Sequence, residues 1–150
     1  KNHYEIVGTA KDQGSIVEYD IEYKSTENTW PASANNNPII KKLKLSIQYQ
    51  SKSALRVKIT DSTSPRWEVP NEYPFPHFQS APSSKPADSD FKVEVIEVPF
   101  QILIKRKSTD EAIWNSKDMN FLYSDLHLDF GTQLPTDNIF GLGERNYKFK

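Results

Sequence analysis

The fold of this chain is set by the stretch Ile39-Ile40-Lys41-Lys42-Leu43-Lys44-Leu45-Ser46-Ile47-Gln48-Tyr49, in which apolar and polar side chains alternate. Leu43, Leu45, Ile47 and Tyr49 fall on one face, and polar residues fall between them. Successive side chains of a β-strand leave opposite faces, so a period of two predicts a half-buried strand.

The same alternation recurs on both sides of this stretch. Residues 55–59 repeat it after a polar segment that predicts a hairpin turn. Further runs lie at 16–23, 93–95, 98–104 and 112–114, and a final strand pair is expected at 120–130 and 138–142. No window carries a helical apolar stripe. Seven or more short strands with polar turns indicate an all-β fold, an antiparallel sandwich or barrel.

Three interruptions divide this pattern. The phase of alternation changes at Glu97-Val98-Pro99, which predicts a bulge or a strand break. Residues 25–38 are polar and turn-rich, and residues 70–90 contain five prolines, so both are expected to be loops. The second loop is long for a compact domain, which indicates a mobile or functional segment.

Length and composition restrict the function. The chain has 150 residues, which suits one domain over 1–150 and is too short for a (β/α)8 barrel of about 250 residues. The formal net charge is −1 and the basic residues are scattered, so we do not expect nucleic-acid binding. No apolar run approaches the roughly 18 residues of a membrane span. The absence of cysteine excludes disulfides and thiolate chemistry.

The first residue is Lys1, and no charged-then-apolar leader follows it. We expect either that a signal or pro-segment has been removed or that the sequence starts internally. No Asn-Xaa-Ser/Thr site is present, so glycosylation offers no evidence about the compartment.

Acidic residues offer two candidate pairs for hydrolytic chemistry. Asp88 with Asp90, and Asp125 with Asp129, would project from one face of a strand, and glycosidases place two carboxyl groups around the scissile bond. Exposed acids on a strand face are the plainer interpretation, and Asp110-Glu111 is typical of a turn.

The three histidines are His3, His77 and His127, and their spacing matches no metal-binding or nucleophile motif. His3 lies in a terminus that is expected to fray, and His127 is expected to point to solvent from a strand.

His77 belongs to an aromatic loop, Tyr73-Pro74-Phe75-Pro76-His77-Phe78, that follows Trp67. Sugars stack on exposed aromatic rings, so this segment is a candidate carbohydrate platform. The alternative is that these rings anchor the long loop on the sandwich, and we favour that interpretation.

Several motifs occur in a characteristic order. Leu55-Arg56-Val57-Lys58-Ile59-Thr60-Asp61 leads to Arg66-Trp67-Glu68-Val69-Pro70, and Phe100-Gln101-Ile102 with Arg106 and Trp114-Asn115 follows. The chain then carries Tyr123-Ser124-Asp125, Leu134-Pro135 and Gly141-Leu142-Gly143-Glu144. The last motif lacks a third glycine and a Lys-Ser/Thr, so it is no phosphate loop. The ordered set resembles the N-terminal β-sandwich domain of glycoside hydrolase family 31, the α-glucosidase and α-xylosidase family.

This resemblance implies a galactose-mutarotase-like antiparallel super-β-sandwich that forms the N-terminal, non-catalytic portion of a retaining α-glucosidase. It implies a catalytic barrel on another chain as partner, an oligosaccharide substrate at a shared pocket, and no cofactor or metal. The compartment would be extracellular or lysosomal, with the endoplasmic reticulum as a third option. The family's catalytic aspartates lie on the barrel, so the resemblance places no catalytic residue on this chain and leaves the substrate-binding residues unknown.

Two departures from the family pattern stand out. Arg145 follows Gly141-Leu142-Gly143-Glu144, where family members often have histidine, and the turn at Thr109-Asp110-Glu111 lacks the usual glycine.

Two other functions remain open from the residues. One is a free-standing carbohydrate-binding sandwich that uses Trp67 and residues 73–78. The other is a structural chain of a larger assembly.

Overall fold

The computed structural model describes residues 2–25, 38–68 and 81–137. Over these ranges the chain contains only strands, turns and irregular segments, and its strands pair antiparallel in three sheets. The predicted all-β sandwich is confirmed. Among the described residues no helix has the length and apolar character needed to cross a lipid bilayer.

The largest sheet has the strand order β1-β2-β3-β4, and a second sheet has the order β5-β6-β7. A third sheet is the two-stranded pair β8-β9. The strands are β1 (His3–Asp12), β2 (Ile16–Lys24), β3 (Lys42–Ser51), β4 (Ala54–Asp61), β5 (Phe91–Ile96), β6 (Gln101–Arg106), β7 (Ala112–Asn115), β8 (Phe121–Tyr123) and β9 (Leu128–Phe130).

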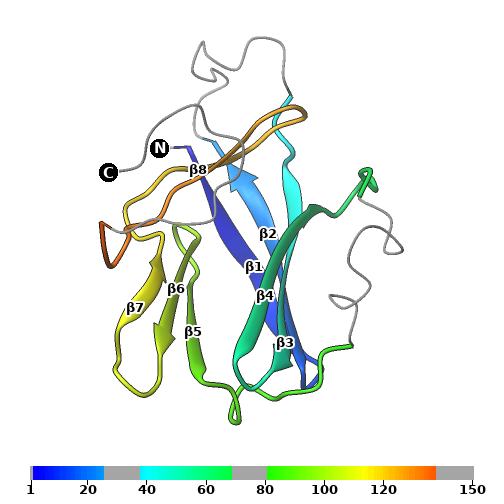
Figure 1. Cartoon of the computed structure of the whole chain (residues 1–150). Helices are drawn as coiled ribbons and strands as arrows, with labels where there is room; N and C mark the ends of the chain where they lie inside the picture. The colour runs from blue at the N-terminus through cyan, green and yellow to red at the C-terminus, as the bar shows by residue number, and fades with distance from the viewer. Residues whose placement is uncertain (1, 26–37, 69–80, 138–150) are drawn as a thin grey trace.

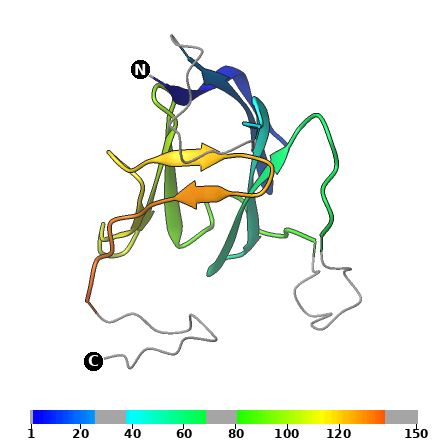
Figure 2. The ribbon, with the colours of Figure 1, turned by 90° about the horizontal axis from the view of Figure 1, so that it is seen from above.

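The two larger sheets lie next to one another, and the β8–β9 hairpin crosses one end of both (Figure 1). The view from above shows the hairpin lying across the space between the two sheets (Figure 2). The hairpin therefore closes one end of the sandwich.

The core lies between the two larger sheets and is built around β3. Leu43, Leu45, Ile47 and Tyr49 are buried, which confirms the face predicted from the alternation. The other buried apolar residues are Tyr4, Ile21, Phe100, Ile102 and Ile104, so both sheets contribute. Under the hairpin, the ring of Phe121 packs against Phe100, Phe130 and Tyr4 at centroid distances of 5.3, 5.1 and 4.9 Å.

The segment 97–100 joins the two sheets along one edge. It forms the turn between β5 and β6, so the predicted strand break is confirmed. The Ile6 N–H donates to the Glu97 carbonyl at 3.0 Å, and the Phe100 N–H donates to the Tyr4 carbonyl at 2.7 Å. The change of phase in the sequence thus marks the place where the chain turns toward β1.

The N-terminus departs from the sequence prediction. His3 was expected in a fraying terminus, but it begins β1 and pairs with Lys24 of β2, so that expectation is wrong. The pairing register shifts between Val7 and Lys11, and Gly8 lies there with φ of 76°. A bulge of this kind disrupts the period of two, which explains why the strand is hard to recognise from sequence.

The expected final strand pair is also different in the structure. Residues 120–130 do not form one partner of a pair, because they fold back on themselves as β8 and β9. The Ser124 N–H donates to the His127 carbonyl at 2.8 Å and closes the turn. The proposed second partner, 138–142, lies outside the described residues.

The described part of the long proline-rich segment, residues 81–90, packs along the β3–β4 hairpin. Its backbone N–H groups at Ser83, Ser84 and Asp90 donate to the carbonyls of Gln50, Tyr49 and Lys52. This portion is therefore tied to the largest sheet.

Candidate functional site

The candidate acidic pairs do not form as predicted. Asp88 and Asp90 lie in turns rather than on a strand. Asp125 lies in the β8–β9 turn, whereas Asp129 lies in β9. The prediction that each pair shares a strand face is therefore wrong, because the turns at 86–90 and 124–127 interrupt the alternation on which it depended.

The described histidines do not come together in a site. His3 is half-buried on β1, and its Nε2 lies 3.5 Å from Glu5 Oε2. His127 is exposed in the β8–β9 turn, so it faces solvent as predicted but not from a strand. His77 lies outside the described residues. No group of three or more His, Asp and Glu side chains within the described ranges has metal-binding geometry.

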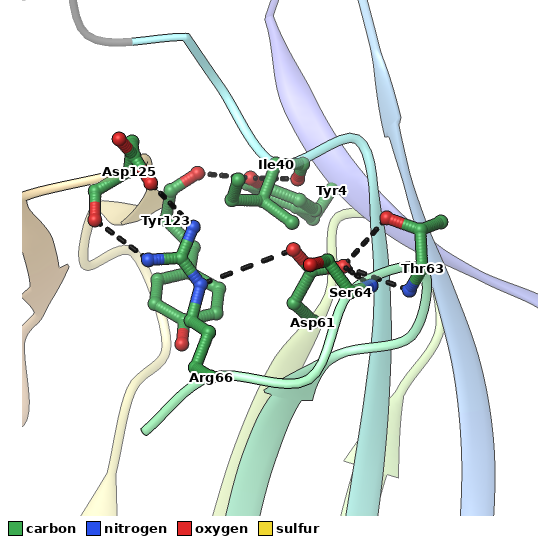
Figure 3. Close-up of polar contacts among 8 residues, drawn as sticks. All are labelled: Tyr4, Ile40, Asp61, Thr63, Ser64, Arg66, Tyr123 and Asp125. Atoms are coloured by element: carbon green, nitrogen blue, oxygen red, sulfur yellow. Dashed lines mark hydrogen bonds and ion pairs between the residues drawn. The ribbon is translucent and has the colours of Figure 1, made fainter.

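The residues that do converge centre on Arg66 (Figure 3). Its Nη1 donates to the Asp125 carbonyl at 2.7 Å, and its Nη2 donates to Asp125 Oδ1 at 2.9 Å. Its Nε lies 3.8 Å from Asp61 Oδ2. The guanidinium carbon lies 5.5 Å from the centre of the Tyr123 ring, within cation–π range. We refer to Arg66, Asp61, Asp125 and Tyr123 as the Arg66 clasp.

Asp61 forms the buried half of the clasp. Its side chain is 4% exposed, and Oδ1 accepts hydrogen bonds from the Thr63 N–H at 2.8 Å, the Thr63 hydroxyl at 2.7 Å and the Ser64 N–H at 3.1 Å. Burial opposes the charged form of Asp61, but these hydrogen bonds and the Arg66 charge outweigh it and lower the pKa of the carboxyl group. Asp61 is therefore an ionised residue that ends β4 and turns the chain toward Arg66.

Behind the clasp, Tyr4 connects the first strand to the hairpin. Its hydroxyl lies 2.8 Å from the Ile40 carbonyl and 2.9 Å from the Tyr123 carbonyl, and its one proton is shared between them (Figure 3). The Ile40 N–H also donates to the Tyr123 carbonyl, at 2.9 Å. Tyr4 is 2% exposed, and burial raises the pKa of its phenol. It is thus a neutral donor at the junction of three chain segments.

A groove of about 710 Å³ lies between β4 and residues 65–68. One wall includes Arg56, Lys58 and Thr60, and the other includes Trp67 and Glu68. Lys58 Nζ lies 2.6 Å from both carboxylate oxygens of Glu68. The hydrogen bond and the charge of Lys58 lower the pKa of the Glu68 carboxyl group.

Trp67 lines this groove with 81% of its surface exposed to solvent. An anchor residue would be buried, so the favoured interpretation of Trp67 as a loop anchor is wrong. Tyr73, Phe75 and Phe78, the other rings of that prediction, lie outside the described residues.

The chemistry of the groove suits binding better than hydrolysis. A glycosidase acid must stay protonated near neutral pH, which requires a raised pKa. The two carboxylates of the groove, Asp61 and Glu68, each face a cation and have lowered pKa values. Neither can serve as a general acid near neutral pH.

A second hollow of about 700 Å³ lies beside β1 and β8. His3, Tyr23, Met119 and Asp129 are among its lining residues. It brings together none of the predicted acidic pairs.

Every residue of the clasp lies in a motif segment that is recognisable in the sequence, but the sequence did not predict that these segments meet. Asp61 ends one motif segment, Arg66 begins the next, and Tyr123-Ser124-Asp125 is a third. The structure places these three segments in direct contact. The only signal for this contact in the sequence was that Arg66 and the two aspartates carry opposite charges. Predicting that they pair also required knowing where the β8–β9 hairpin lies.

Comparison with known proteins gives relatives that share most of this chain. Intestinal sucrase-isomaltase of Suncus murinus is 34% identical over 129 residues, which are 86% of this chain and 7% of that protein. Intestinal sucrase-isomaltase of Oryctolagus cuniculus is 32% identical over 97% of this chain and 8% of its own length. Lysosomal acid alpha-glucosidase of Tetrahymena pyriformis is 34% identical over 75% of this chain and 12% of its own length.

These relatives are family 31 glycoside hydrolases, the family that the motifs indicated. No family model matches the chain. The chain spans 7–12% of the length of the three relatives, so it corresponds to a small part of each.

Proposed function

We propose that this chain is the N-terminal, non-catalytic β-sandwich portion of a retaining family 31 α-glucosidase. In this role residues 1–150 form one domain that supports the catalytic barrel and walls one side of the substrate pocket. The enzyme would remove terminal α-linked glucose from oligosaccharides. No catalytic residue, cofactor or metal is assigned to the chain itself.

The observation that carries this proposal is the coverage of the relatives. The matches extend over 75–97% of this chain but over at most 12% of each glucosidase relative. A segment of that relative size supports a role as one domain of such an enzyme. The contact between three of the quoted motif segments in the Arg66 clasp supports the same assignment, because it gives those motifs a structural role.

The β8–β9 hairpin offers a surface for the barrel. Leu126 and Leu128 are 83% and 58% exposed, and Leu134, just beyond the hairpin, is 54% exposed. Apolar side chains gathered on one exposed element often mark an interface. We propose that the barrel of the same enzyme covers them, whether it lies on the same polypeptide or on a separate processed chain.

The lysosomal relative supports a lysosomal or secreted location, with the endoplasmic reticulum as the remaining compartment. Fractionation of the native source should place the protein in one of these compartments. Recovery in the cytosol would contradict the proposal.

Two measurements test the central claim. The purified 150-residue chain should not hydrolyse a chromogenic α-glucoside, and native material should co-elute with α-glucosidase activity and a barrel of several hundred residues. Turnover by the pure chain would refute the non-catalytic role. Native material that elutes alone and without activity would favour a free-standing module or a structural chain.

A further inference from the structure

We propose that the groove between β4 and residues 65–68 is a carbohydrate-binding site in which Trp67 is the stacking platform. The ligand class is a neutral oligosaccharide, and the choice of an α-linked glucan rests on the proposed function.

The first argument is the position of Trp67 relative to its neighbours. Residues 65–68 follow the bends after β4 and belong to no strand, so the contacts of each side chain show where it points. Arg66 turns toward Asp61 and Asp125, and Glu68 turns back to Lys58 of β4. Trp67 lies between these two residues, takes part in neither contact and has 81% of its surface exposed.

The second argument is rigidity. The residue before Trp67 makes two hydrogen bonds to Asp125, and the residue after it makes two contacts of 2.6 Å with Lys58. Both neighbours are therefore attached to the sandwich. An aromatic ring on a backbone held from both sides loses little conformational entropy when a ligand stacks on it.

The third argument is the polar lining. Arg56, Lys58 and Arg66 face Asp61 and Glu68 in one groove, so three cations and two carboxylates nearly balance. A nearly neutral groove has no strong field that would select a polyanion. Its charged groups can still donate to and accept from sugar hydroxyls beside the indole, while the faces of pyranose rings offer C–H groups to the ring.

The test is calorimetric titration of the full chain with maltotriose, using cellotriose as the linkage control. Calorimetry is preferred because Trp67→Ala also removes a fluorophore. We expect saturable binding of maltotriose, weakened about tenfold or more in Trp67→Ala, which corresponds to about 1.4 kcal/mol. Trp67→Tyr should recover much of the affinity, because the aromatic platform is restored.

Two further variants separate stacking from positioning. Lys58→Met should weaken binding by a smaller factor, because it releases the residue after Trp67 and leaves the ring in place. Val98→Ala, which truncates a 60% exposed residue outside the groove, should bind like the original chain. Circular dichroism of each variant confirms that it is folded.

Several results would overturn this inference. They are the absence of binding of both trisaccharides at millimolar concentration, equal affinity in Trp67→Ala and the original chain, and binding of a proline-rich peptide at Trp67 without any sugar binding. Equal affinity for both trisaccharides would support a carbohydrate site at Trp67 but contradict its selectivity for an α-linked glucan. Each of these outcomes leaves the proposed role beside the barrel intact, because that role is tested by co-elution and turnover.

Discussion

The middle of β4 and its C-terminal end belong to regions that are stabilised by different forces. Beside the middle, Leu45 and Ile47 of β3 contribute to a core that is joined to the second sheet by apolar contact. At its end, Asp61, Arg66 and Asp125 join the sheet to the β8–β9 hairpin through charge and hydrogen bonds. The core should resist changes of pH and salt, whereas the clasp should respond to both.

The largest expected effect comes from the core. Leu45 is fully buried, and Leu45→Ala removes its contacts and leaves a cavity between the sheets. We expect a loss of about 3 kcal/mol in the free energy of unfolding. Urea denaturation followed by far-UV circular dichroism measures it. A loss below about 1 kcal/mol would mean that the two sheets are not held chiefly by this core.

The next effect comes from the clasp. Arg66→Met retains much of the side-chain length but leaves Asp61 buried without its cation and removes both donors to Asp125. We expect a loss of about 2 kcal/mol, since hydrogen bonds to charged groups contribute about 1.5–3 kcal/mol. Arg66→Lys is the matched control, and it should recover part of the loss because it keeps the charge without the fork. Equal stability of Arg66→Met and the original chain would remove the clasp as a stabilising element.

A smaller effect should appear as a dependence on pH. The pKa of Asp61 is lowered in the fold, so its contribution is present above the unfolded value and is lost as pH falls through the folded value. As pH falls from about 5 through the ordinary aspartate pKa of about 3.9 and below it, the stability advantage of the original chain over Asp61→Asn should therefore shrink. Thermal unfolding of both proteins across this range measures the difference. A constant difference would contradict the assignment.

The smallest effect should come from the surface pair beside the groove. Lys58 and Glu68 are 32% and 56% exposed, and exposed ion pairs contribute about 0–1 kcal/mol. Lys58→Met should change the unfolding free energy by less than about 0.5 kcal/mol. The same variant should still weaken sugar binding. A large loss of stability would instead indicate that the Lys58–Glu68 pair mainly stabilises the fold.

The sequence predicted those parts of the fold in which the period of two is uninterrupted. The buried face of β3 and the turns at 52–53 and 107–111 follow from local alternation and polar turn residues. In the latter turn Asp110 has φ of 55°, a left-handed conformation that aspartate tolerates better than most residues. The missing family glycine there is therefore accommodated by Asp110.

The unpredicted parts depend on bulges and on distant partners. The shift near Gly8 disguised β1, and the turn at Ser124 divided an apparent single strand into two. The clasp joins residues 59 positions apart, Arg66 and Asp125, so no local window contains its partners. The exposure of Trp67 likewise depends on where its neighbours are attached, which alternation in a short irregular segment does not reveal.

The hydroxyl of Tyr4 also sets a condition on the order of folding. It contacts the carbonyl of Tyr123, which is 119 residues away along the chain. Contacts of such long separation slow folding, because much of the chain must be ordered before they form. During synthesis the first strand emerges long before the hairpin that it binds, so the finished sandwich must await the C-terminal third of the domain. Until then the rings of Tyr4 and Phe100 are not covered by the ring of Phe121. Apolar surface that stays exposed during synthesis favours aggregation, so the nascent chain is most vulnerable before the hairpin forms.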